Sequence, residues 1–171
     1  VDLFAGVGGL SLGFEQACFD VVAAVEIDPI HAATHHFNFP KTAVLNRSVQ
    51  ELRGSDILEA AGLKNGEVSV VVGGAPCQGF SLIGHRALDD PRNSLVLDFV
   101  RLVRELAPSY FVFENVKGLT VGQHKIFLEE VIRIFGDIDY QIRLPWQVLD
   151  ATSYGVPQHR ERLFLVGARK G

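Results

Sequence analysis

Cys77 is the residue of this sequence whose surroundings most favour chemistry. It stands in the stretch GGAPCQGFS, directly after a run of aliphatic residues, where the glycines and Pro76 predict a turn that presents the thiol. A thiol becomes nucleophilic when neighbouring cations lower its pKa, and Arg160 and Arg162 later in the chain could do so. The stretch therefore predicts a reactive thiol, with a small buried apolar cysteine as the alternative.

Arg160 and Arg162 lie in the block SYGVPQHRERLF, which leads into a short apolar run near the end of the sequence. Side chains alternate along a strand, so both guanidinium groups should point to one face and could enter a common site. A solvated edge of a sheet is the alternative for two arginines in an RER triplet.

Glu114 and Asn115 place an acid and an amide directly after another buried apolar run, in the block FVFENV. Apolar surroundings raise the pKa of a carboxyl group, so Glu114 could stay protonated long enough to act as a general acid. A capping or ion-paired glutamate is the alternative.

The first block, DLFAGVGG, contains three glycines between an apolar run and a segment of helical period. Gly6, Gly8 and Gly9 permit positive φ and a close approach of the backbone to a ligand, which predicts a nucleotide-like ligand rather than a merely structural turn. Ser11 stands where the dinucleotide fingerprint needs glycine, and no Lys-Ser/Thr pair follows as in a P-loop. Glu26, about 20 residues on, has the placement of an acid that binds ribose hydroxyls.

These blocks fall between elements that alternate in type, which is typical of βαβ units around a parallel sheet. Strands are expected at residues 1–4, 21–26, 68–73 and 110–114, and weaker ones near residue 43, at 141–148 and at 163–166. Helices are expected at residues 10–17, 29–37, 95–106 and 125–135, the third capped by Asn93 or Ser94. We predict one α/β domain over residues 1–171 with a Rossmann-like, doubly wound, mostly parallel sheet. Such sheets bind ligands at the carboxyl ends of their strands, where the blocks lie, and the long loop 78–92 is expected to be functional.

Composition supports one packed domain. The chain has 171 residues, 47% of them hydrophobic and 21% charged, which is the range of globular proteins. No apolar run approaches the ~20 residues of a membrane helix, and no signal peptide is visible. The sequence contains no methionine and begins in an expected strand, so we expect a segment of a longer protein. Its net charge of −4 argues against nucleic-acid binding unless a basic surface lies elsewhere.

The cysteine and histidine content predicts neither a disulfide nor a metal site. Cys18 and Cys77 lie far apart in unlike surroundings, which indicates a reducing compartment. His31, His35 and His36 share one expected helix, where a metal pair is conceivable, but no cysteine or carboxylate cluster accompanies them. A solvated helix surface is the preferred interpretation for these histidines.

Taken together, DLFAGVGG, the acidic strand end at Glu26, GGAPCQGFS, FENV and PQHRER resemble the ordered motif set of the DNA cytosine carbon-5 methyltransferases. The resemblance covers essentially the whole chain and implies S-adenosylmethionine as cofactor. It assigns to the cofactor Phe4, Gly6, Gly8, Gly9, Glu26, Ile27, Ser48, Val49 and Pro76. The family usually carries Asp-Ile where this chain has Ser48-Val49, so an uncharged group stands at the contact to the adenine amino group. Cys18 occupies a turn position where the family often has glycine.

The resemblance also implies a mechanism. The Cys77 thiolate adds to carbon-6 of a cytosine flipped out of the duplex, while Glu114 protonates or hydrogen-bonds ring N3, and carbon-5 then attacks the sulfonium methyl. Arg160 and Arg162 favour the thiolate, and Arg162 also contacts the O2 atom of the base. Asn115 positions either the loop or the polar edge of the base. The loop 78–92 acts as a lid, with Ser81 and Arg92 near the DNA phosphates.

By the same resemblance, the partner is double-stranded DNA, and a restriction endonuclease that acts on the same site is a candidate partner. We expect a monomer without metal or membrane attachment, in the bacterial cytoplasm with the nucleoid, or in the nucleus of a eukaryotic host. The target-recognition region and last motifs of the family follow the arginine block. We therefore expect these residues alone not to select a DNA sequence.

Four other interpretations remain open at this point. A tRNA cytosine carbon-5 methyltransferase could be built on the same motifs. A nicotinamide-dependent oxidoreductase would use the glycine block and Glu26 but leaves Cys77 unexplained. A cysteine hydrolase would pair Cys77 with His85 or His159. A catalytically silent DNA-binding protein is disfavoured, since every motif acid, thiol and arginine is present.

Overall fold

The structure is a computed structural model that describes residues 1–76, 94–122 and 124–171. The loop predicted at residues 78–92 therefore lies outside the described residues. Within the described part of the chain, no helix has the length and apolar character needed to cross a membrane.

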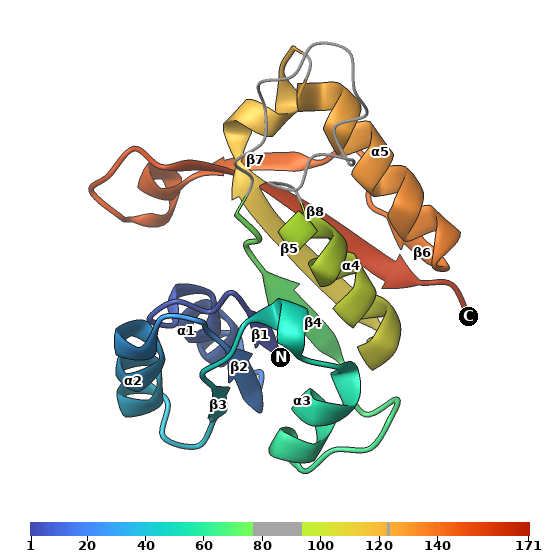
Figure 1. Cartoon of the computed structure of the whole chain (residues 1–171). Coiled ribbons are helices and arrows are strands. Elements are labelled where there is room, and N and C mark those ends of the chain that lie inside the picture. Colours follow the sequence, from blue (N-terminus) through green and yellow to red (C-terminus); the bar gives the residue numbers. More distant parts are fainter. Residues whose placement is uncertain (77–93, 123) are drawn as a thin grey trace.

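The described residues form an eight-stranded sheet, with strand order β3-β2-β1-β4-β5-β8-β6 and β7 paired with β8 (Figure 1). Its strands are β1 (Asp2–Leu3), β2 (Ala23–Val25), β3 (Ala43–Leu45), β4 (Val70–Gly73), β5 (Tyr110–Val116), β6 (Tyr140–Ile142), β7 (Gln147–Asp150) and β8 (Glu161–Arg169). The pairs from β3 to β5 are parallel, whereas β8 runs antiparallel to β5, β6 and β7. The predicted doubly wound, mostly parallel α/β sheet is confirmed.

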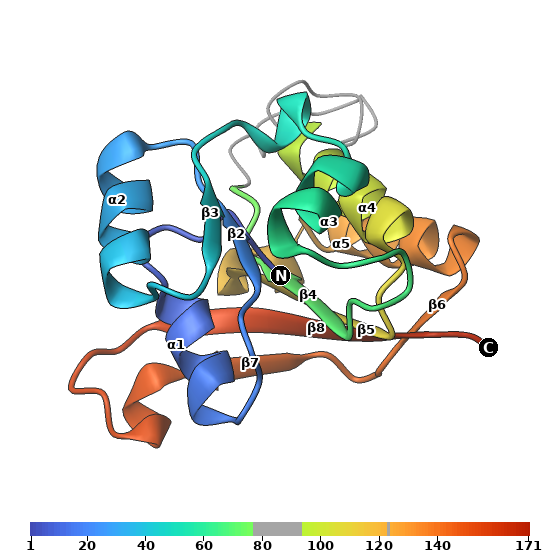
Figure 2. The same cartoon turned by 90° about the horizontal axis from the view of Figure 1, so that it is seen from below.

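Helices cover both faces of this sheet. They are α1 (Gly9–Gln16), α2 (Pro29–Asn38), α3 (Gly54–Ala61), α4 (Ser94–Leu106) and α5 (His124–Asp137), with short 3₁₀ turns η1 (Val49–Glu51), η4 (Lys117–Thr120) and η5 (Ala151–Tyr154). Figure 2 shows α3, α4 and α5 on one side of the sheet and α1 on the other. β2 and β3 lie on one side of β1 in the sheet, and β4 and β5 lie on the other. Right-handed crossovers in these two opposite directions place helices on opposite faces of the sheet.

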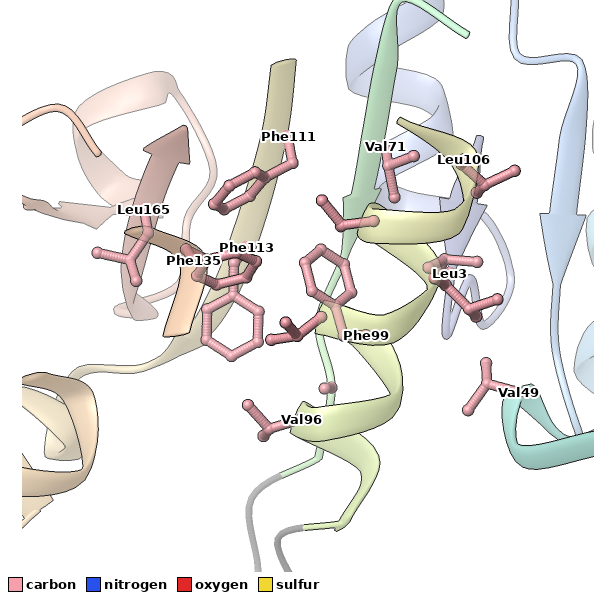
Figure 3. Close-up of a cluster of buried hydrophobic side chains, with 14 of the residues drawn as sticks. Leu3, Val49, Val71, Val96, Phe99, Leu106, Phe111, Phe113, Phe135 and Leu165 are labelled. Carbon is pink, nitrogen blue, oxygen red and sulfur yellow. The ribbon is translucent and has the colours of Figure 1, made fainter. Parts of the chain in front are cut away.

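The core lies between α4, α5 and the middle strands. Phe99 of α4 packs edge-on against Phe111 and Phe113 of β5, with ring centroids 6.2 and 5.3 Å apart (Figure 3). Phe111 also stacks on Phe135 of α5, at 4.0 Å between centroids. Because side chains alternate along β5, these buried rings leave Glu114 on the opposite face of the strand. The aromatic core thus fixes the direction of the acid.

Two elements differ from the prediction. α3, a helix of eight residues, was not predicted, and the Gly54 N–H of its first turn also donates to Glu105 Oε2 of α4 at 2.6 Å. The expected strand at 141–148 is instead two strands, β6 and β7, which pair with different parts of β8. The split into β6 and β7 depends on their pairing with β8, whereas α3 has local signals in the capping side chain of Asp56 and the left-handed Gly62.

Candidate active site

The glycine block forms a tight turn between β1 and α1. Phe4, Gly6 and Gly8 all have positive φ, at 60°, 54° and 99°. A Cβ atom at Gly8 would collide with the ring of Phe39, which packs directly behind the turn. Glycine is therefore required at position 8 both for its backbone conformation and for this close approach.

Glu26 connects the glycine turn to the turn that follows β2 at the same edge of the sheet. Its carboxylate accepts the Gly6 N–H at 2.7 Å and the Asp28 N–H at 2.8 Å, and the residue is 8% exposed. Each carboxylate oxygen keeps a further lone pair for a ligand hydroxyl. Glu26 is thus oriented by the backbone at the position predicted from its spacing.

Asn46 is a residue of this edge that the sequence analysis missed. Its amide donates to the carbonyl oxygens of Glu26 and Ile27, at 2.9 and 3.0 Å. The contact fixes the turn that presents both residues. The available signal was a polar residue directly after β3, at the same edge of the sheet.

A cavity of about 380 Å³ opens beside Glu26. It is lined by the predicted cofactor residues Phe4, Glu26, Ile27, Ser48, Val49 and Pro76, together with Val25, Arg47, Gln50, Gly74 and Leu95. Apolar walls with one oriented carboxylate suit a nucleoside, whose base is flat and whose ribose carries hydroxyls. Gly6 and Gly8 do not line this cavity. Gly9 borders a second cavity instead.

Ser48 supplies a capping hydroxyl to the cavity wall. Its Oγ accepts the Gln50 N–H at 3.3 Å and so caps the short turn η1. The hydroxyl is uncharged, and its contact is to the protein backbone.

The predicted acid and arginine meet on neighbouring strands. Arg162 Nε lies 3.0 Å from Glu114 Oε1, and the two side chains are 24% and 20% exposed. In the antiparallel pairing of β5 with β8, Glu114 is opposite Phe164, two residues from Arg162, so both side chains share one face. Burial raises the pKa of Glu114 above its ordinary value, while the charges of Arg162 and Arg160 oppose this shift.

Gly74 makes room for that carboxylate. A Cβ atom at this position would lie 2.7 Å from Glu114 Oε2. Asn115, which is 4% exposed, holds the same segment by donating its amide to the Ala75 carbonyl at 2.9 Å. Of the two roles predicted for Asn115, this contact supports positioning of the loop that leads to residue 77.

Two cavities adjoin the Glu114–Arg162 pair. One, of about 430 Å³, is lined by Gly9, Leu10, Glu114, Leu149, Ala151, Tyr154, Arg160, Arg162 and Phe164. The other, of about 290 Å³, is lined by Gly74, Ala75, Pro76, Glu114, Asn115, Val116, Arg160 and Arg162. Arg160 and Arg162 thus reach common cavities, as expected from their alternation. Gly74 and Pro76 also border the cavity beside Glu26.

Asp150 organises the segment that carries Arg160, a role that the sequence analysis missed. Its carboxylate accepts the N–H groups of Thr152 and Arg160 at 3.1 and 3.2 Å, and lies 3.0 Å from His159 Nδ1. The bond to His159 is the main reason that the pKa of Asp150 is lowered, and the same bond raises the pKa of His159. His159 is thereby engaged with a carboxylate at the surface.

Several predictions fall outside the described residues. Cys77, Ser81, Arg92, Asn93 and His85 lie there, so their predicted roles stay predictions. Among the described residues, no group of three His, Cys, Asp or Glu side chains could hold a metal ion.

The histidines of α2 require a correction. His35 is fully buried and lies 3.0 Å from Ser11 Oγ through its Nε2 atom, so the expectation of a solvated surface was wrong at this position. The helix turns His35 inward because α2 packs against the glycine turn, whereas His31 and His36 are exposed as expected. Cys18 is also exposed, and its φ of 65° fits a position where the family often has glycine.

Comparison with known proteins gives a consistent result. A type II methyltransferase of Xanthomonas oryzae pv. oryzae, M.XorII, is 61% identical over the whole chain, which spans 40% of that protein. M.AquIA of Picosynechococcus is 42% identical, and the chain spans 72% of it. The chain thus spans less than half of the first relative.

Solved structures agree with the sequence relatives. A DNA modification methyltransferase encoded within an E. coli prophage superposes with a TM-score of 0.82 at 39% identity, over 98% of this chain and 45% of the other. Spodoptera frugiperda DNMT2 superposes with a TM-score of 0.75 at 26% identity, over 99% of this chain and 49% of the other. The family profile of the C-5 cytosine-specific DNA methylases matches residues 1–171, and the chain therefore belongs to that family.

Proposed function

We propose that the protein transfers a methyl group from S-adenosylmethionine to carbon-5 of a cytosine flipped out of duplex DNA, through a covalent adduct with Cys77. The observation that carries the proposal is the pairing of Glu114 with Arg162, 3.0 Å apart, on a cavity that shares Gly74 and Pro76 with the one beside Glu26. A general acid, a cation and a nucleoside cavity are thus neighbours at one edge of the sheet.

The cavity beside Glu26 fits the adenosine half of the cofactor. Phe4, Ile27 and Val49 offer apolar surface to the base, and the Glu26 carboxylate offers acceptors to the ribose hydroxyls. Bound S-adenosylmethionine would supply an electrophilic methyl group. The residues of this chain bind and orient it.

The chain's own residues account for activation of the base. The Cys77 sulfur forms a bond to carbon-6, the ring electrons move toward carbon-5, and ring N3 takes a proton or hydrogen bond from Glu114. A raised pKa of Glu114 keeps a proton available for this purpose. After methylation, solvent takes the carbon-5 proton, and the electrons of that C–H bond form the carbon-5–carbon-6 double bond. The sulfur–carbon-6 bond breaks and releases the thiolate, and ring N3 returns its proton to Glu114. Arg162 holds Glu114 and offers donors to the base.

Cys77→Ala in the full protein is the decisive test. We expect methyl transfer to duplex DNA to be abolished, while calorimetry shows unchanged binding of S-adenosylmethionine, because the variant keeps Glu26 and the other described residues that line the cavity beside it. Appreciable turnover by this variant would remove Cys77 from the mechanism.

The same assays separate the alternative functions. Methyl incorporation into tRNA but not DNA would favour the tRNA enzyme, and calorimetric binding of NAD in place of S-adenosylmethionine would favour an oxidoreductase. A thioester hydrolysis assay tests a cysteine hydrolase.

We further propose that residues 1–171 form the catalytic, cofactor-binding domain, and that sequence selection depends on a region that these residues lack. The chain spans 40% of its Xanthomonas relative, which leaves room for such a region there. A monomer in the bacterial cytoplasm at the nucleoid, with an endonuclease acting on the same DNA site, completes the proposal.

A further inference from the structure

Three polar side chains form a buried chain of hydrogen bonds beneath the glycine turn between β1 and α1. Ser11 Oγ lies 2.7 Å from Asp2 Oδ2 and 3.0 Å from His35 Nε2. All three residues are fully buried. None of them lines the cavities at the carboxyl edge of the sheet, so the proposed reaction does not use them.

At neutral pH, the donor and the acceptor of each hydrogen bond among these three side chains can be assigned. Ser11 has one hydroxyl hydrogen, and the ionised Asp2 carboxylate can only accept, so Ser11 donates to Asp2. His35 must then donate its Nε2–H to Ser11 Oγ, which leaves Nδ1 as a bare acceptor. Nδ1 has no hydrogen-bond partner among the described residues, and this tautomer leaves no buried donor of His35 unsatisfied.

This chain brackets the glycine turn from both sides. Asp2 lies in β1 just before the turn, and Ser11 lies in the first turn of α1 just after it. The ring of His35 packs on Phe39, with centroids 4.7 Å apart, and Phe39 packs against Gly8. The hydrogen bonds therefore connect the beginning and the end of the turn, and the packing of His35 on Phe39 connects them to its back.

The turn needs such support. Phe4 has a φ of 60°, a conformation that is unfavourable for a residue with a side chain and persists only where its surroundings enforce it. The glycine turn also orients Glu26, because the Gly6 N–H donates to the Glu26 carboxylate at 2.7 Å. A displacement of the turn would thus move the acceptor that faces the ribose.

We propose that the chain His35–Ser11–Asp2 holds the glycine turn in the shape that receives S-adenosylmethionine, so that Ser11 and His35 are positioning residues for the cofactor. This inference rests on the cofactor binding proposed above. Neither residue touches the cofactor; each acts through the turn and Glu26.

Ser11→Ala in the full protein tests the proposal. We expect the Kd for S-adenosylmethionine, measured by calorimetry well below the melting temperature, to rise about tenfold, as for loss of one buried hydrogen bond. The KM for the cofactor should rise with it, while kcat at saturating cofactor stays within about twofold, because the reacting groups are elsewhere.

Tyr140→Phe is the matched control. Tyr140 is also buried and donates its hydroxyl to the Pro108 carbonyl at 2.7 Å, in the part of the sheet formed by β6 and β8. Its removal deletes one buried hydrogen bond without touching the glycine turn. We expect a loss of thermal stability similar to that of Ser11→Ala and an unchanged Kd.

A pair of substitutions at His35 gives an independent measurement. His35→Gln keeps an N–H donor for Ser11, whereas His35→Leu removes it, and both lose the ring that packs on Phe39. The proposal requires His35→Leu to bind the cofactor several-fold more weakly than His35→Gln. This comparison also serves if Ser11→Ala does not fold.

The outcomes separate the two proposals. If the unmodified protein does not bind S-adenosylmethionine, the proposed function fails and this inference falls with it. If the unmodified protein binds the cofactor but the Ser11 or His35 variants bind it equally well and lose only thermal stability, the inference alone is overturned.

Discussion

The two halves of the sheet build their sites from different kinds of contact. In the parallel half, Glu26, Asn46 and Ser48 each bond to backbone groups of nearby turns. In the antiparallel half, charged side chains pair with one another: Glu114 of β5 with Arg162 of β8, and Lys117 of η4 with Glu161 of β8. The contacts of Glu26 and Asn46 join turns 20 residues apart in the sequence, whereas the Glu114–Arg162 pair depends on the register of β5 and β8. The first half thus orients its acid through backbone groups and the second through a charged side chain.

The largest expected effect concerns the pair in the antiparallel half. Glu114→Gln keeps the shape of the side chain but removes the transferable proton, so kcat should fall by about 10²–10⁴ while the Kd for the cofactor is unchanged. Steady-state methylation kinetics and calorimetry measure the two quantities. Glu161→Gln, which breaks only the exposed pair with Lys117, is the control and should be close to neutral. Weaker cofactor binding in Glu114→Gln would contradict the division between the two halves.

A buried carboxylate in the parallel half predicts a pH effect. Burial is the main cause that raises the pKa of Asp2 from 3.8 to about 6. The folded state therefore holds this proton more tightly than the unfolded chain, and stability falls as pH rises from about 4 to about 6, by about 3 kcal/mol for this group. Asp2→Asn should remove this component. Denaturant unfolding of the unmodified protein and the Asp2→Asn variant at pH 4 and pH 7 tests the sign. If their free energies of unfolding differ by the same amount at both pH values, the predicted pH effect of Asp2 is refuted.

Gly74 lies where the two halves meet. Gly74→Ala would place a Cβ atom 2.7 Å from Glu114 Oε2 and push the carboxylate away from its position. We expect kcat to fall about tenfold, which corresponds to about 1.4 kcal/mol. Gly13→Ala, in α1 with nothing near the new Cβ, is the control and should be neutral or slightly stabilising. Equal activity of both variants would show that the close contact at Gly74 does not matter.

The smallest effect is expected at the surface. His159 is exposed and pairs with Asp150, so His159→Ala should lower kcat/KM less than about threefold, as for other exposed ion pairs. The same variant tests the cysteine hydrolase interpretation, which requires His159 or His85 as a base. A loss of methyl transfer beyond 10²-fold, or of any thioesterase activity, would give His159 a larger role.

The sequence predicted those features that local patterns determine. Glu26 and the glycine turn were found because strand, turn and helix signals adjoin them in the sequence. Glu114 and Arg162 were found from motif blocks, and their contact then required the β5–β8 register. Asn46 was missed because its partners are the carbonyls of Glu26 and Ile27, which only the folded chain brings near. Asp150 was missed because its contacts to His159 and Arg160 require the turn between β7 and β8. His35 was misassigned because helical period alone does not say which face of α2 is covered.

The segment from Gly74 to Pro76 borders the cavities on both sides of the site. Anything that shifts this shared wall, whether the base or the cofactor, changes the space left for the other ligand. By thermodynamic reciprocity, each ligand must then alter the affinity for the other by the same factor. Asn115 anchors this wall by donating its amide to the Ala75 carbonyl.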